Sequence, residues 1–188
     1  MGNDEYTKKL EKVIQELIRP IKNLPFHLII KSLSGYEVDK FNPDDENHRI
    51  TLEALKEVAR LSCRLINKEG IKRKRANEVG NDIEKFVKEA FIKFDYKADK
   101  PTTSTGKKKS TGYPDLEFCV LDNQYHYLEC KSYNVKNMNS SMRTFYLSPA
   151  KDFKITHPGI HFIICFEIYQ DHKEEDFNVY KTRGWKIL

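Results

Sequence analysis

Apolar residues recur at helical spacing in two segments near the N-terminus, each bounded by a recognisable end signal. The first segment covers residues 6–18 and stops at Pro20. The second begins at Asn42 and Pro43, which suit a cap and a first helical turn, and continues through about Asn67. These segments predict a helical layer at the start of the chain.

A third helical pattern covers residues 79–94, where the apolar positions form one broad stripe. Such a stripe is typical of a helix that packs on a sheet. At about 100° per residue, Glu84 flanks the stripe and is expected to look along the sheet edge, whereas Glu78 points nearly away from it. Residues 25–41 show no clear period, and their SGYEVDKF stretch allows a short strand.

Alternating apolar and polar positions in the second half of the chain predict a β-hairpin. One face of its two strands is formed by Leu116, Phe118, Val120, His126, Leu128 and Cys130. These residues meet across the hairpin only if the loop has an odd number of residues, and we expect three around Asp122 and Asn123. The same parity puts Asp115 on the opposite face, together with Glu129 and Lys131.

Two further patterns complete a predicted sheet. The run HFIICFEI is continuously apolar, as in a strand buried on both faces, and the tail FNVYKTRGWKIL suits a short final strand or hairpin. We therefore expect an α/β protein with a mixed central β-sheet flanked by helices. Residues 1–70 would form an N-terminal helical subregion that supports the fold or a dimer, and residues 71–188 the core, within one compact domain.

The composition permits a polyanionic partner without requiring one. The 188 residues include 33 Lys and Arg against 28 Asp and Glu, a net charge of +5, and 12% aromatic residues, which argues against disorder. The charged N-terminal stretch resembles neither a signal peptide nor a membrane span, so we expect a cytoplasmic protein without a membrane partner. The scattered cysteines fit neither a zinc site nor a disulfide scaffold, and we expect them to be reduced and mostly buried.

Two carboxylates and an ammonium group on one sheet face suit a hard divalent cation. Mg²⁺ prefers oxygen ligands and keeps several waters, so Asp115 and Glu129 would leave positions for a phosphate oxygen and a nucleophilic water. Lys131 would orient that water and stabilise developing negative charge. Glu117 lies on the same face and is a further candidate. The arrangement predicts hydrolysis of a nucleic-acid backbone.

The same residues form a known motif. Pro114-Asp115, followed after thirteen residues by Glu129-Cys130-Lys131, resembles the PD-(D/E)XK nuclease motif, and its surroundings resemble type II restriction endonucleases. A looser likeness extends over roughly residues 74–168, through the helix with NEVGNDIE, the polar loop before the motif and the stretch SSMRTFYLSP. The resemblance implies a restriction-endonuclease-like core, with elements in the order αβββαβ.

The resemblance also implies a role for each motif residue. Asp115 and Glu129 would be metal ligands, and Lys131 the catalytic lysine. Glu84 would be the helix carboxylate that some members add to the metal site. The variable middle residue, Cys130, would point its side chain into the core and offer its backbone carbonyl to the metal.

By this resemblance, the protein would be a Mg²⁺-dependent, sequence-specific endonuclease of a restriction-modification system, with Mn²⁺ able to substitute. It would cleave double-stranded DNA to leave 5′-phosphates. It would act as a homodimer, because one chain supplies one active site and a duplex needs two cuts. Other nucleases with this core, such as a junction resolvase or a repair nickase, remain alternatives, as does a catalytically inactive DNA-binding module.

Several basic and polar residues are candidates for DNA contacts. They are Lys107, Lys108 and Lys109 in the loop before the motif, Ser140, Ser141 and Arg143 after it, and Arg73 and Arg75 in a basic cluster. The loop lysines are well placed for the phosphate backbone. Alternatively, the basic cluster forms a solvated helix entry, and the later segment a capped turn with a surface arginine. The sequence TGKKKST lacks the spacing of a nucleotide-hydrolase phosphate loop, so no nucleotide cofactor is expected.

Overall fold

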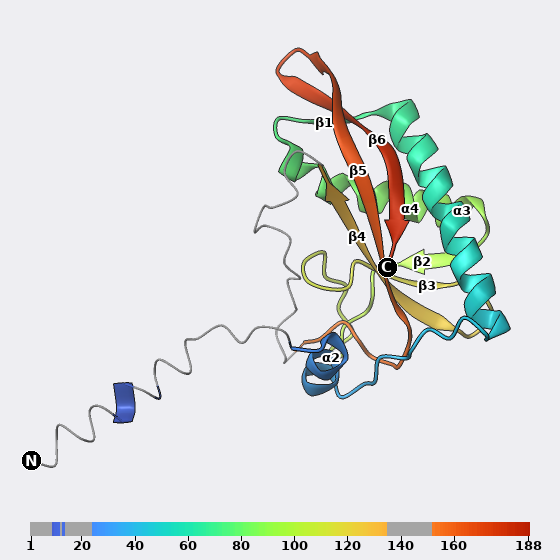
Figure 1. The fold of residues 1–188 in the computed structure, drawn as a ribbon, viewed down its shortest axis with the longest axis vertical. Helices are drawn as coiled ribbons and strands as arrows, with labels where there is room; N and C mark the ends of the chain where they lie inside the picture. Colours follow the sequence, from blue (N-terminus) through green and yellow to red (C-terminus); the bar gives the residue numbers. More distant parts are fainter. Residues whose placement is uncertain (1–8, 12, 14–23, 135–151) are drawn as a thin grey trace, which may run out of the picture.

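The computed structural model describes residues 9–11, 13, 24–134 and 152–188. Within these ranges the helical elements are α2 (Phe26–Ser34), α3 (Glu46–Glu69), the short 3-10 helix η1 (Ala76–Glu78) and α4 (Gly80–Lys93). The strands are β1 (Ile71–Arg73), β2 (Lys97–Asp99), β3 (Leu116–Cys119), β4 (Tyr125–Tyr133), β5 (His161–Glu174) and β6 (Phe177–Ile187). Figure 1 shows the long β5–β6 hairpin extending past the rest of the sheet.

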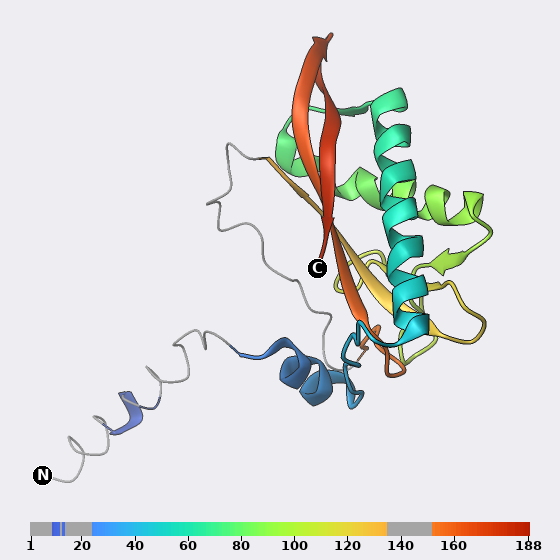
Figure 2. The same cartoon turned by 45° about the vertical axis from the view of Figure 1, so that its right-hand side comes forward.

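The strands form one mixed, six-stranded sheet in the order β1-β6-β5-β4-β3-β2. β4 and β5 are parallel, and every other neighbouring pair is antiparallel. Helices α3 and α4 lie on one side of the sheet, and α2 lies toward the other (Figure 2). The expected α/β class, with a mixed sheet and flanking helices in a restriction-endonuclease-like core, is confirmed.

The main core lies between the sheet and helices α3 and α4. Its buried residues come from the predicted stripe of α4 and from the predicted apolar face of the hairpin, as in the contact between the Phe91 and Phe118 rings, whose centroids are 5.2 Å apart. α3 adds Leu55, Val58 and Ile66 to the same core and packs on α4 and β6. Burial of this continuous apolar surface fixes which sheet face is covered.

A second, smaller core covers part of the opposite sheet face. It joins Ile30 of α2, Tyr113, Tyr127 of β4, Phe153 and Ile155, all of which are buried. FHLIIKSLS, which showed no clear period, forms helix α2 over this core. In the SGYEVDKF stretch, which allowed a short strand, Val38 makes an isolated bridge to Gly159. The rest of this face is left for the site described below.

The second predicted helix begins later than expected. α3 starts at Glu46 and is capped by Asp45, whose side chain accepts a hydrogen bond from the His48 N–H at 3.0 Å. Asn42 instead accepts from the N–H of Asp44 at 3.0 Å, within the turn before the helix. Both residue types suit a cap, so the local sequence does not choose between them. Of the first predicted helix, residues 9–11 and 13 are described, and they are helical.

Four strands differ from the sequence expectation. β1 and β2 are short edge strands that no pattern predicted, because three residues are too few to show a period. β6 is long, since it pairs with both β5 and β1. In β5 the apolar run alternates between buried and half-buried residues, so only one of its faces is fully covered. The expectation of burial on both faces is therefore wrong.

The division at residue 70 stays a prediction, although α3 from the N-terminal side contributes directly to the main core. Among the described residues, no helix combines the length and the apolar character needed to cross a bilayer. None of the four cysteines forms a disulfide bond; Cys119 and Cys130 are buried, and Cys63 and Cys165 are half-buried.

Candidate active site

The hairpin that carries the motif has the predicted parity. Leu116 pairs with Leu128, and Phe118 with His126, so the apolar positions face one another. The pairing ends at Cys119 and Tyr125, which leaves a loop of residues 120–124, longer than the three residues expected but still odd. By the same register, the position before Leu116 lies across from Glu129, on the face opposite the main core.

Asp115 occupies that position and is tied to the neighbouring strand. Its Oδ2 accepts a hydrogen bond of 2.8 Å from the backbone N–H of Cys130. Burial raises the pKa of the Asp115 carboxyl, against the lowering effect of this hydrogen bond and of the charge on Lys131. The side chain thus takes the place of a backbone acceptor just before Leu116, the first residue of β3.

Glu129 and Lys131 extend from β4 on the same face. The Lys131 ammonium lies 2.5 Å from Oε1 of Glu129, whose side chain is only 5% exposed. Burial, followed by the charge of Asp115, raises the pKa of Glu129 to about 7. Its Oε2 is also buried and has no hydrogen-bond partner among the described residues. Two acidic groups are therefore held together where their charged forms are poorly compensated.

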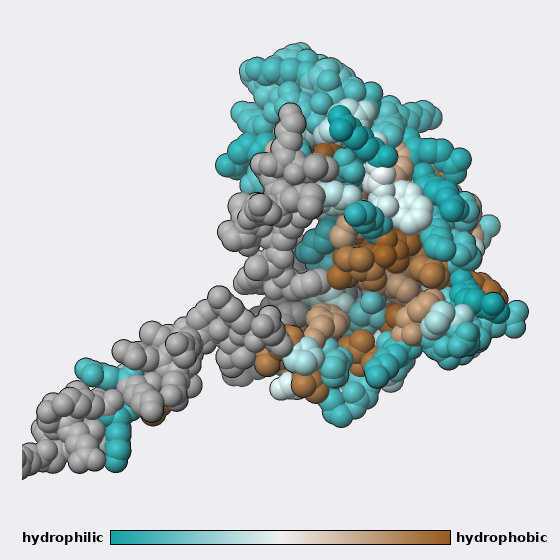
Figure 3. Space-filling view, viewed as in Figure 1, coloured by the Kyte–Doolittle hydropathy of each residue, from teal (hydrophilic) through white to brown (hydrophobic). Residues whose placement is uncertain are grey.

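Glu84 of α4 lines a cleft that Asp115 and Lys131 also line. This cleft of about 590 Å³ is lined by Ala76, Asn77, Gly80, Asn81, Glu84, Ser110, Asp115, Cys130, Lys131, Ser132, Tyr133, Asn134, Ile163, Cys165, Ile168 and Leu188. Burial and, next, the nearby Asp115 charge raise the pKa of Glu84. The cleft is thus acidic where α4 meets the hairpin, and apolar along β5 and the C-terminus. Figure 3 shows hydrophobic residues gathered near the centre of this face of the molecule.

The donor set suits a hard divalent cation that brings its own waters. Within residues 24–134 and 152–188, no three His, Cys, Asp or Glu side chains stand close enough together to enclose a metal ion. Mg²⁺ does not require such a cage, since it usually binds through one or two carboxylates and keeps several waters. The buried, unpartnered Oε2 of Glu129 beside Asp115 is what such an ion would satisfy. The residues present therefore fit the ion.

Lys154 is a residue at this site that the sequence did not identify. Its side chain is buried, and its Nζ donates hydrogen bonds to the carbonyl oxygens of Gly112, at 2.6 Å, and Pro114, at 2.9 Å. Burial lowers its pKa, and the charges of Asp115, Glu84 and Glu129 oppose that shift. Lys154 follows a long mixed segment with no period, so nothing local distinguished it from a surface lysine.

The loop lysines predicted to contact DNA are exposed or nearly so, and two of them form ion pairs within the chain. The Lys108 ammonium lies 2.5 Å from Asp99, and Lys109 pairs with Asp152. The backbone of Lys107 helps to close the same loop through its carbonyl, which accepts from the N–H of Thr103 at 2.8 Å. Their contact with DNA stays a prediction.

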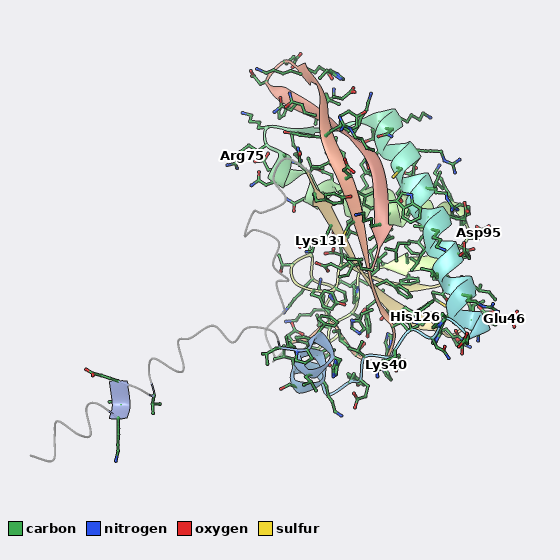
Figure 4. The ribbon with its side chains drawn as sticks, viewed as in Figure 1. Lys40, Glu46, Arg75, Asp95, His126 and Lys131 are labelled. Carbon is green, nitrogen blue, oxygen red and sulfur yellow. The ribbon has the colours of Figure 1, made fainter. Side chains whose placement is uncertain are left out.

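The arginines of the basic cluster also have acidic partners. Arg73 binds Asp82 of α4 through two hydrogen bonds, of 2.6 and 2.7 Å, and Arg75 binds Glu78 of η1 at 2.8 Å. Both alternatives for these two residues, a solvated helix entry and a DNA contact, stay predictions. In Figure 4, Lys131 lies near the centre of the molecule and Arg75 at its periphery. Ser140, Ser141 and Arg143, the other predicted DNA contacts, lie outside the described residues.

Comparison with known proteins identifies the family of this chain. The model of the type II restriction enzyme MjaV family matches residues 18–188. The chain belongs to this family. Its relative in Methanocaldococcus jannaschii, the type II restriction enzyme MjaV, is 35% identical over 206 aligned residues, which cover 100% of this chain and 86% of that protein. Family membership thus extends well beyond the motif, into the helices that precede it.

Proposed function

We propose that this chain is a Mg²⁺-dependent, sequence-specific endonuclease of a restriction-modification system that cleaves double-stranded DNA. The observation that carries the proposal is the pair of carboxylates, half-buried Asp115 and buried Glu129, held beside Lys131 in a member of a type II restriction enzyme family. Mn²⁺ would substitute for Mg²⁺, because both accept oxygen ligands.

In this proposal Asp115 and Glu129 hold the cation. The Cys130 carbonyl is a third candidate ligand, because the N–H and C=O of one strand residue project to the same side, and the Cys130 N–H points at Asp115. The chemistry supplied by a bound divalent cation is neutralisation of phosphate charge and activation of water. Glu84 would add a carboxylate from α4, at the edge of the same cleft.

Lys131 would orient the attacking water and stabilise the negative charge that develops on the phosphate. Water adds to phosphorus as the P–O3′ bond breaks, which leaves a 5′-phosphate on one product and a 3′-hydroxyl on the other. The buried Glu129 holds the Lys131 ammonium in place before substrate arrives. This preorganisation lowers the cost of placing the cationic group during the reaction.

DNA contact and the oligomer belong to the same proposal. The loop of Lys107, Lys108 and Lys109 would follow the phosphate backbone, together with Ser140, Ser141, Arg143, Arg73 and Arg75. A homodimer would bring two sites to a palindromic sequence. The N-terminal subregion could support the dimer through the outer face of α3, where Ile50 is exposed.

The test is digestion of plasmid and genomic DNA by the purified full chain, with Mg²⁺ or with EDTA, followed by sequencing of the ends. We expect discrete fragments with 5′-phosphates at one short sequence, only with metal, and none from Asp115→Ala or Lys131→Met. Light scattering should give twice the 22.2 kDa chain mass.

Several results would contradict the proposal. Identical fragments from wild type and Asp115→Ala would show that the site is elsewhere. Nicks in one strand only, or cutting restricted to branched DNA, would favour a nickase or a junction resolvase. Specific binding without any cutting would favour an inactive DNA-binding module.

A further inference from the structure

In the segment immediately before Asp115, two backbone carbonyl groups accept hydrogen bonds from one side chain. Gly112, with a φ of 84°, and Pro114 lie in a turn that ends two residues before Leu116, where β3 begins. Backbone carbonyls buried away from water need a donor, or they cost free energy. In this turn the donor for both is a single side chain, Lys154.

Lys154 is buried, so its ammonium group has no access to solvent. Its relative exposure is 1%, whereas lysine is almost never fully buried unless it is paired. Its two neighbours in the sequence, Phe153 and Ile155, are buried in the second core. Two fixed neighbours and two short hydrogen bonds therefore hold the ammonium in one position.

That position is also electrostatically linked to the proposed metal ligands. The charges that favour the protonated form of Lys154 are those of Asp115, Glu84 and Glu129, in that order. Lys154 thus links the backbone just before Asp115 with the charges of the surrounding carboxylates. Its partner Pro114 lies 40 residues away in the sequence.

We propose that Lys154 is a positioning residue for the metal site, which holds the Gly112–Pro114 turn so that the Asp115 carboxylate is presented beside Glu129. This inference rests on the proposed function. Lys154 acts through Asp115 and does not touch the scissile phosphate, which separates its role from that of Lys131. Partners of this kind orient the ligand and tune its affinity for metal.

The test compares Lys154→Met, which keeps the length and apolar stem, with wild type and with Lys173→Met, an exposed lysine in the β5–β6 hairpin. Ca²⁺ alone is titrated into each DNA-free protein by calorimetry, at a temperature where circular dichroism shows it folded. We expect Ca²⁺ affinity to fall about 10- to 100-fold in Lys154→Met, the range typical of such partners, and to stay unchanged in Lys173→Met. DNA affinity in EDTA should stay close to wild type.

A purely structural role would lower the thermal midpoint without changing the metal affinity of the folded protein. A fall in Ca²⁺ affinity smaller than about threefold would therefore overturn the inference, whatever happens to stability. If Lys154→Met does not fold, Lys154→Gln, which keeps a shorter donor, is judged by the same criterion. If wild type itself neither binds Ca²⁺ nor cuts DNA, the proposed function fails, and this inference with it. If wild type does both and the variant matches it, only the role of Lys154 fails.

Discussion

The backbone N–H of Cys130 donates a 2.8 Å hydrogen bond to the carboxylate of Asp115. This bond joins the two halves of the motif, because Cys130 stands between Glu129 and Lys131 in the sequence. It also shows why the aspartate lies one residue before β3: its side chain takes the place of a backbone acceptor at the end of the ladder.

Replacing Asp115 with Asn should separate activity from stability. Asn keeps an oxygen that accepts from the Cys130 N–H but removes the charge, so cleavage should fall about 100-fold or more, as when one preorganised electrostatic group is lost. Because burial raises the pKa of Asp115, its ionised form destabilises the metal-free fold, and Asp115→Asn should unfold at the same or a higher denaturant concentration. Cleavage kinetics and urea unfolding in EDTA measure the two effects. Asp122→Asn, in the exposed hairpin loop, is the control; a large loss of stability in Asp115→Asn would contradict this account.

Glu84→Gln should change metal dependence more than the maximal rate. The Glu84 carboxylate lies in the same cleft as Asp115, and the charge of Asp115 helps to raise its pKa. If Glu84 joins the metal site, the Mg²⁺ concentration for half-maximal cleavage should rise about tenfold. Glu89→Gln on the same helix should leave the Mg²⁺ titration unchanged. Superimposable titrations of wild type and Glu84→Gln would remove Glu84 from the site.

Exchange of Lys107, Lys108 and Lys109 for Ala should weaken DNA binding evenly across sequences. Each lost phosphate contact should reduce the slope of log K against log salt by about 1. The ion pairs of Lys108 with Asp99 and of Lys109 with Asp152 would have to open or be shared with phosphate. The three exchanges together should therefore reduce the slope by less than about 3. Equilibrium binding at several salt concentrations gives the slope. A matched triple exchange of the exposed Lys68, Lys93 and Lys173 should leave it intact, and equal slopes for both variants would contradict the proposed contact.

The His157–Glu117 pair should make stability depend on pH. The Nε2 of His157 lies 2.8 Å from Oε1 of Glu117, and this hydrogen bond is the main reason that the pKa of His157 is raised. Because the pKa of His157 is higher in the folded state, the pair's contribution to the free energy of unfolding is fully present below the unfolded-state pKa, about 6.5. It is lost as pH rises through the higher folded-state pKa. For a half-exposed pair this should be no more than about 1 kcal/mol. Unfolding free energies of wild type and Glu117→Gln should converge above that range, and a constant difference across pH would refute the assignment.

Much of the motif hairpin could be predicted because its determinants are local. Leu116, Phe118, Leu128 and Cys130 alternate with polar residues, and their burial on one face forces Asp115 and Glu129 onto the other. Only the loop length was misjudged, since three and five residues satisfy the same parity. The stripe of α4 was equally readable, and with it the direction of Glu84.

Other features depended on contacts between distant segments. Three-residue strands such as β1 and β2 exist because β6 and β3 offer them hydrogen-bonding partners, and no local pattern records that. The choice of Asp45 over Asn42 as the cap of α3 was likewise not decided by residue type, because both residues suit a cap. For β5, an apolar run did not reveal that one face borders the cleft.

The sequence by itself determined the class of fold, the motif and the face on which its charged residues lie, because side-chain alternation along a strand is a local property of the backbone. Only the tertiary structure decided that Lys154 supports the turn before Asp115. It also decided that Lys108, Lys109 and the arginines of the basic cluster are paired with acidic residues. Such pairings join segments that are far apart in the chain, and their free energy depends on burial and distance, which are defined only once the core has formed.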